Sequence, residues 1–155
     1  MKPIILISSL LVLNTLVTEV QAKPCTALLL PSLATQVVGI ALRNLLENHT
    51  VCVGSASPWQ AQEYHQTPSG GTNNLIDFKH GANSVNDPTA HDPTAPVGSW
   101  AISGNVVSYT YHNSGGTVYH DEVYNNGDTP TTYTFCDQSG NTTNASVVLP
   151  GQVVC

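Results

Sequence analysis

Two short stretches of the sequence each place a carboxylate and an imidazole two residues apart. WQAQEYHQ holds Glu63 and His65, and YHDEVY holds His120 and Glu122. Both stretches read as strands, on which residues two apart share a face. If the two pairs met, their side chains could bind a divalent transition metal or act as a general acid and base.

A simpler interpretation of these four residues competes with the site. A Glu and a His near a strand end are usually solvated, and such a surface pair contributes under about 1 kcal/mol to stability. We therefore expect the two pairs to lie on separate parts of the sheet. A metal site would need at least three of the four side chains to approach one point, and we predict no cofactor.

The turns beside a tyrosine-rich stretch predict which side chains accompany these pairs. A two-residue turn at Gly104-Asn105 would set Trp100 opposite Tyr109. If NSGG then forms an even-length turn, odd-numbered residues before the turn share a face with even-numbered residues after it. A change of one residue in the length of the loop would move each residue after it to the opposite face. The predicted common face comprises Trp100, Tyr109, Tyr111, Val118, His120, Glu122 and Tyr124.

Aromatic walls with a few polar groups suit a small-molecule pocket. We therefore predict a ligand-binding site formed by Trp100, Tyr109, Tyr111 and Tyr124. Other catalytic schemes lack their signatures, because there is no Gly-x-Ser-x-Gly elbow, no His-Glu-x-x-His and no phosphate-binding loop. The carboxylates carry no signature of a glycosidase cleft either. The sequence thus favours a non-enzymatic protein, with no catalytic residues predicted.

A sheet has to position these residues, and the sequence from Thr50 onward is typical of one. Short runs rich in β-branched and aromatic residues alternate with turn-forming clusters of Gly, Asn, Ser, Asp and Pro. This pattern predicts a mainly β fold, an antiparallel meander that forms a small barrel or a sandwich. The predicted strands are 50–54, 59–66, 74–80, 99–103, 106–112, 117–124, 131–136 and 145–149.

One helix is predicted before the sheet, over residues 32–48. Apolar residues recur there at helical spacing, with Leu33 and Ile40 on one stripe and Leu42 and Leu45 on another. Gly39 and the β-branched residues weaken the helix, so it should be stable only when packed on the sheet.

The N-terminus reads as an export signal. A short positive start precedes the apolar run IILISSLLVLNTLVT, which is too short for a membrane anchor, and small residues then suit a signal peptidase. We expect a signal peptide over 1–22, an N-terminal segment with the helix over 23–48, and a β-domain over 49–155. Within the β-domain, the segment 81–97 repeats DPTA and is predicted to be an inserted loop.

The mature chain would be acidic. It keeps three basic residues, Lys23, Arg43 and Lys79, against nine acidic ones, so the net charge stays at −6. Three scattered cations cannot neutralise a row of phosphates, so we expect neither nucleic acid nor an anionic membrane surface as a partner.

The cysteine count indicates an oxidising compartment. An exported chain with an even number of cysteines is expected to form disulfides, and here there would be two. The sequence leaves all three pairings open, and no cysteine spacing supports zinc. We therefore predict a secreted or periplasmic protein whose disulfides involve Cys25, Cys52, Cys136 and Cys155.

The run GSWAISGNVVSYTY, residues 98–111, resembles a pattern of lipocalin-like exported β-domains, in which a Gly-x-Trp strand precedes a Tyr-rich strand. The chain from about residue 45 to 155 is similar to uncharacterised small secreted bacterial β-domain proteins. The resemblance implies the fold class and export. It departs from lipocalins because Gly98-Ser99-Trp100 lies in mid-chain and Arg43 is the single arginine, so a ligand-carrying calyx does not carry over.

Three functions follow from these observations, in order of preference. The first is an exported β-domain that binds a small apolar or aromatic molecule, or an envelope or extracellular protein, without catalysis. The second is a secreted inhibitor or interaction protein that acts through the loop 81–97. The third is a metal-binding protein or metalloenzyme built on Glu63, His65, His120 and Glu122.

Overall fold

The computed structural model of the chain describes residues 25, 30–54, 59, 61–67, 73–77 and 95–155. The expected signal peptide and most of the predicted loop 81–97 lie outside these residues. The described elements are β1 (Thr35–Gln36), α1 (Gly39–Leu46), β2 (His49–Val53), β3 (Ala61–Gln66), β4 (Asn74–Asp77), β5 (Ala95–Ser103), β6 (Val106–Tyr111), β7 (Val118–Asn125), β8 (Tyr133–Asp137) and β9 (Thr142–Pro150).

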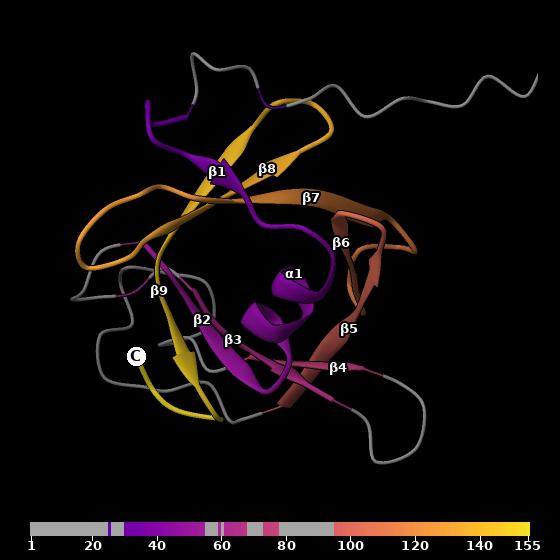
Figure 1. The fold of residues 1–155 in the computed structure, drawn as a ribbon. Helices are drawn as coiled ribbons and strands as arrows, with labels where there is room; N and C mark the ends of the chain where they lie inside the picture. Colours follow the sequence, from indigo (N-terminus) through magenta and orange to yellow (C-terminus); the bar gives the residue numbers. More distant parts are fainter. Residues whose placement is uncertain (1–24, 26–29, 55–58, 60, 68–72, 78–94) are drawn as a thin grey trace, which may run out of the picture.

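The strands from β2 to β9 form an antiparallel meander that curls on itself. Each strand pairs with the next along the chain. β9 also pairs with β2, so every strand from β2 to β9 has two neighbours within a closed ring. This ring is that of a barrel rather than a sandwich (Figure 1). The predicted fold class is confirmed, and each of the predicted strands is present with ends shifted by a few residues.

The helix is shorter than the sequence predicted. It covers Gly39–Leu46 rather than 32–48, and the residues before it form β1, which pairs with β7. Val38 is extended, with φ −128° and ψ 156°, and Gly39 has a φ of 55°. Because β-branched valine favours extended backbone and glycine tolerates a positive φ, the chain turns here before the helix begins.

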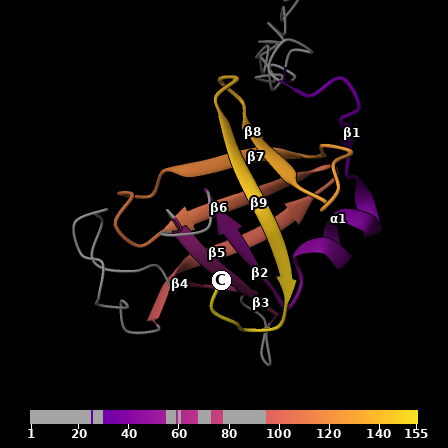
Figure 2. The ribbon, with the colours of Figure 1, turned by 90° about the vertical axis from the view of Figure 1, so that its left-hand side faces the viewer.

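α1 lies across one end of the barrel, as two perpendicular views show (Figures 1 and 2). Leu42 and Leu46 have no exposed surface and belong to the core, together with Val107 and Val123 of the sheet. The predicted stripe of Leu33 and Ile40 was wrong, since both side chains are more than two thirds exposed. No helix among the described residues is long and apolar enough to span a membrane.

Two disulfides attach segments outside the ring to the sheet. Cys25 pairs with Cys136 of β8, and Cys52 of β2 pairs with Cys155 at the C-terminus. The structure therefore selects one of the three pairings that the sequence left open. Paired cysteines are typical of proteins that fold in an oxidising, extracytoplasmic compartment.

Candidate functional site

β3 directs the side chains of Glu63 and His65 into the barrel. His65 has only 1 % of its surface exposed, and its ring meets the edges of Trp100 and Tyr109 at centroid distances of 5.2 and 5.6 Å. The alternating residue Gln62 lies on the outer face, where its side-chain oxygen accepts a 2.7 Å hydrogen bond from the Cys155 backbone. Glu63, two residues from His65, therefore shares the inner face with it.

The predicted pairing of Trp100 with Tyr109 is confirmed, but the next register was wrong. Tyr109 lies opposite Tyr119, and Val107 lies opposite Asp121. Thr110 pairs with Val118, so an odd number of residues separates the paired positions rather than the even number that we expected. Since successive strand residues alternate between faces, this difference of one residue turns Tyr119 and Asp121 inward.

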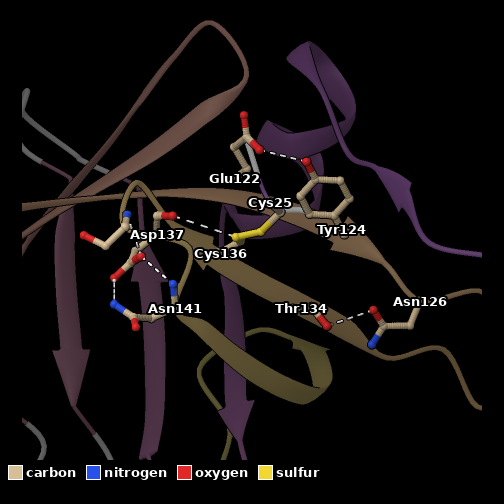
Figure 3. Close-up of a disulfide and its surroundings, with 9 residues drawn as sticks. Cys25, Glu122, Tyr124, Asn126, Thr134, Cys136, Asp137 and Asn141 are labelled. Atoms are coloured by element: carbon tan, nitrogen blue, oxygen red, sulfur yellow. Dashed lines mark hydrogen bonds between the residues drawn. A yellow bond between two sulfur atoms is a disulfide. The ribbon is translucent and has the colours of Figure 1, made fainter. Parts of the chain in front are cut away.

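The same register turns the second Glu/His pair outward. His120 lies 2.8 Å from the Ser108 hydroxyl on the outer face. Glu122 accepts a 2.7 Å hydrogen bond from the Tyr124 hydroxyl beside the Cys25–Cys136 disulfide (Figure 3). Burial and this hydrogen bond raise the pKa of Tyr124 to about 12.

The two Glu/His pairs thus lie on opposite faces of the sheet, on separate parts as we expected. The structure does not bring Glu63, His65, His120 and Glu122 together. Among the described residues, no group of three or more His, Cys, Asp or Glu side chains could hold a metal ion. Tyr124 is likewise separated from Trp100, Tyr109 and Tyr111, because it follows the outward register of Glu122.

Three tyrosines form an aromatic wall that runs from the core toward the end of the barrel opposite α1. The ring of Tyr111 stacks on that of Tyr109, with centroids 6.4 Å apart, and it meets the Tyr119 ring at 5.8 Å in an edge-on arrangement. Tyr109 is 6 % exposed and Tyr119 is 45 % exposed, so the wall reaches the surface.

Hydrogen bonds fix the tautomer of the histidine at the foot of this wall. The Nδ1 atom of His65 lies 3.2 Å from the Glu63 carbonyl oxygen, which can only accept, so Nδ1 carries the proton. The Nε2 atom then accepts a hydrogen bond from the Tyr109 hydroxyl at 3.0 Å. Burial lowers the pKa of His65 to about 4, and burial also raises the pKa of Tyr109, so both groups are neutral at physiological pH.

A second tyrosine is bonded to a carboxylate on the far side of the ring. The Tyr111 hydroxyl donates to the Glu63 carboxylate, with oxygen distances of 3.1 and 3.2 Å. The Glu63 side chain holds the hydroxyl of Tyr111 across the lumen, because β3 and β6 are not adjacent strands. Burial and the neighbouring carboxylate raise the pKa of Tyr111, so its hydroxyl keeps the proton that it donates.

These side chains surround a cavity of about 220 Å³. Phe135, Val51 and Val53 supply apolar surface, and exposed residues such as Asn141 mark its opening. A neighbouring hollow of about 300 Å³ shares Glu63 and Tyr111 with it. The cavity is lined by Val51, Val53, Glu63, His65, Tyr109, Tyr111, Tyr119, Asp121, Phe135, Asp137, Asn141 and Thr143.

Two aspartates in the lining have different roles. Asp137 accepts hydrogen bonds from the backbone amides of Ser139 and Asn141 and from the side chain of Asn141 (Figure 3). These hydrogen bonds lower the pKa of Asp137, and the one from the Asn141 side chain has the largest effect. Asp137 therefore closes the β8–β9 turn. Asp121 accepts no hydrogen bond from a described residue, and burial, followed by the charge of Asp137, raises its pKa to about 6.

Tyr119 and Asp121 are the site residues that the sequence reasoning missed. Both stand in YHDEVY, beside the His and Glu that drew attention. The signal that could have found them is the length of the loop after Tyr111, because an odd spacing places Tyr119 and Asp121 inside and His120 and Glu122 outside.

Comparison with known proteins leaves the chain without an assigned family: no protein-family model, no curated protein and no solved structure matches it. The lipocalin-like resemblance of residues 98–111 therefore remains a prediction. Function has to be argued from the cavity and from the groups that line it.

Proposed function

We propose that this chain is an exported protein that binds a small molecule, without catalysis, inside its barrel. The observation that carries the proposal is the cavity of about 220 Å³ beneath the Tyr109–Tyr111–Tyr119 wall. An eight-stranded barrel is just wide enough either to be filled by side chains or to hold one small ligand. Here α1 and the core fill one end, and the cavity lies toward the other.

The size of the cavity limits the ligand. A cavity of roughly 150 Å³ holds benzene, whereas drug-sized ligands occupy roughly 300–1,000 Å³. A volume of about 220 Å³ therefore suits one aromatic or aliphatic ring with a short substituent. The rings of Tyr111, Tyr119 and Phe135 offer apolar contact, and Glu63 and Asp121 supply the few polar groups that orient a ligand.

The protonation states of His65 and Tyr109 favour binding over proton transfer. His65 and Tyr109 are hydrogen-bonded to each other, and burial moves their pKa values away from neutrality in opposite directions. A general acid or base works best with a pKa near the operating pH. These two residues are therefore suited to orienting a ligand rather than to exchanging protons with it.

Export is the second part of the proposal. The N-terminal signal-peptide pattern and the disulfides Cys25–Cys136 and Cys52–Cys155 support it together. Disulfides persist in the periplasm and outside the cell, where glutathione and thioredoxin do not reduce them. A binding protein in these compartments would meet its ligand in the surrounding medium.

The cavity can be tested with a neutral probe of the right size, phenethyl alcohol. The disulfide-bonded protein is titrated with the probe while its backbone amide signals are followed by NMR. Thr143 lines the cavity, whereas Thr142 precedes it on the other face of β9, so both can be replaced by phenylalanine as a matched pair. We expect shifts at Tyr111 and Tyr119, weakened about tenfold or more by Thr143→Phe and unchanged by Thr142→Phe.

Two results would overturn the binding proposal. One is the absence of saturable shifts around the cavity with the unmodified protein. The other is equal affinity of the probe for Thr143→Phe and for the unmodified protein, provided that both proteins give the dispersed spectrum of a folded barrel.

A further inference from the structure

The polar atoms at the floor of the cavity are hydrogen-bond acceptors. The proton of the Tyr109 hydroxyl is donated to His65, and that of the Tyr111 hydroxyl is donated to Glu63. His65 donates its own ring proton to a backbone carbonyl. The oxygen lone pairs of the two tyrosines therefore remain for a ligand, and a ligand that supplies donors fits them best.

The charges in the lining have one sign. Glu63 lies on β3 and Asp121 on β7, which stand four places apart in a ring of eight and so face each other across the lumen. Asp137 adds a third carboxylate at the opening. None of the described lining residues is a lysine or an arginine, and the histidine among them is neutral because burial lowers its pKa.

Among the described residues, none places a positive charge beside Asp121. Arg43 is the one lysine or arginine among them, and its guanidinium donates to Glu47 at 2.8 Å on α1, at the opposite end of the barrel. Carboxylates that face a low-dielectric cavity attract a cation more strongly than carboxylates in water do.

We propose that the ligand is an organic cation, an apolar or aromatic body that carries a protonated amine. This inference rests on the proposed function, because it names the class of molecule that the cavity binds. The ammonium group would donate to the Asp121 carboxylate and to the tyrosine oxygens. The faces of Tyr111 and Tyr119 would add cation–π attraction, and the body would pack against Phe135.

The raised pKa of Asp121 agrees with a cationic ligand. Burial raises the pKa of Asp121 to about 6, which means that the empty cavity holds its negative charge poorly. A cation beside the carboxylate would lower that pKa again. An anionic ligand would instead meet the negative charges of Asp121 and Asp137.

The test compares three molecules of nearly equal shape: phenethylamine, which is a cation at neutral pH, phenethyl alcohol, which is neutral, and phenylacetate, which is an anion. Affinities are measured by NMR titration of the disulfide-bonded protein. We expect phenethylamine to bind about tenfold more tightly than the alcohol, a difference of about 1.4 kcal/mol, and phenylacetate to bind most weakly.

Neighbouring residues on β7 provide matched variants. Asp121→Asn removes one negative charge inside the barrel, and Glu122→Gln removes one outside it. We expect the preference for the amine over the alcohol to fall to about twofold in Asp121→Asn and to stay at about tenfold in Glu122→Gln. Affinity for the alcohol should change little in either variant.

Each other outcome is informative. If the alcohol binds but the amine binds no better, or if phenylacetate binds best, the cation inference is overturned and the small-molecule proposal stands. If Glu122→Gln reduces the preference as much as Asp121→Asn, the attraction belongs to the surface charge, and the assignment to the cavity is overturned. If none of the three molecules binds, both proposals fail.

Discussion

Asp121 and His65 face the same cavity, and burial displaces their pKa values in opposite directions. The pKa of Asp121 is raised from 3.8 to about 6, so between these values the folded protein binds more protons than the unfolded chain. Its contribution to stability is fully present below pH 3.8 and is lost as the pH rises through 6. The pKa of His65 is lowered from 6.5 to about 4, so its contribution is present above pH 6.5 and is lost as the pH falls through 4.

The two contributions therefore oppose each other over the same range of pH, and replacing one residue should reveal the other. We expect Asp121→Asn to raise the free energy of unfolding at neutral pH by about 1 kcal/mol, because it removes a buried charge. Between pH 6 and 4 the variant should lose stability more steeply than the unmodified protein, because His65 then acts without compensation. Urea denaturation over a series of pH values measures both effects.

Glu122→Gln is the control for this prediction, since Glu122 lies on the outer face. Its free energy of unfolding at neutral pH should not rise as that of Asp121→Asn does, because the substitution removes no charge from inside the barrel. Parallel profiles for Asp121→Asn and the unmodified protein would contradict the account of Asp121. A variant that is more stable but binds the amine less well would indicate that Asp121 is kept for binding at a cost in stability.

At the scale of the elements, α1 closes the barrel end opposite the cavity. Leu42 and Leu46 are its buried contacts, whereas Ile40 on the same helix is 71 % exposed. We expect Leu42→Ala to lower the free energy of unfolding by about 2–5 kcal/mol, because it leaves a cavity between the helix and the sheet. Ile40→Ala should change it by about 0.5 kcal/mol or less. Thermal and urea denaturation of both variants would check this, and equal losses would contradict the packing described for α1.

The strands could be predicted from the sequence because their signals are local. Turn-forming residues bound each strand, and the two-residue turn Gly104-Asn105 sets the register of β5 and β6 without help from the rest of the chain. Gly98 in the Gly-x-Trp pattern also has a local reason, since a Cβ atom there would collide with the Thr110 carbonyl oxygen.

Other features depend on contacts that the sequence does not display. The loop after Tyr111 allows even or odd pairing, and the packing of Val123 in the core decides between them. The helix was overpredicted because Val37 and Val38 have the apolar spacing of a helix. Val38 instead has extended backbone, and Val37 donates a 2.8 Å backbone hydrogen bond to Val123 on β7.

At the scale of the molecule, the C-terminal tail is held against the outside of the ring by a disulfide and by hydrogen bonds. The Cys155 amide donates to Gln62 at 2.7 Å, and the Val153 amide donates to the Thr50 hydroxyl at 3.2 Å. Gln62 and Thr50 have no exposed surface, so the tail provides partners for polar groups that water does not reach. An unpaired buried polar group costs about 1–3 kcal/mol.

Cys52–Cys155 should therefore stabilise the protein in two ways, by restricting the unfolded chain and by keeping the tail over Gln62 and Thr50. We expect the double variant Cys52→Ala/Cys155→Ala to lower the free energy of unfolding by roughly 2–4 kcal/mol. The amide of residue 155 should lose its protection from hydrogen exchange. Affinity for phenethyl alcohol should change by less than about threefold, because the tail lies outside the cavity. Unchanged stability would contradict the stabilising role of the disulfide. A loss of probe binding in a variant that remains folded would show that the tail and the cavity are not independent.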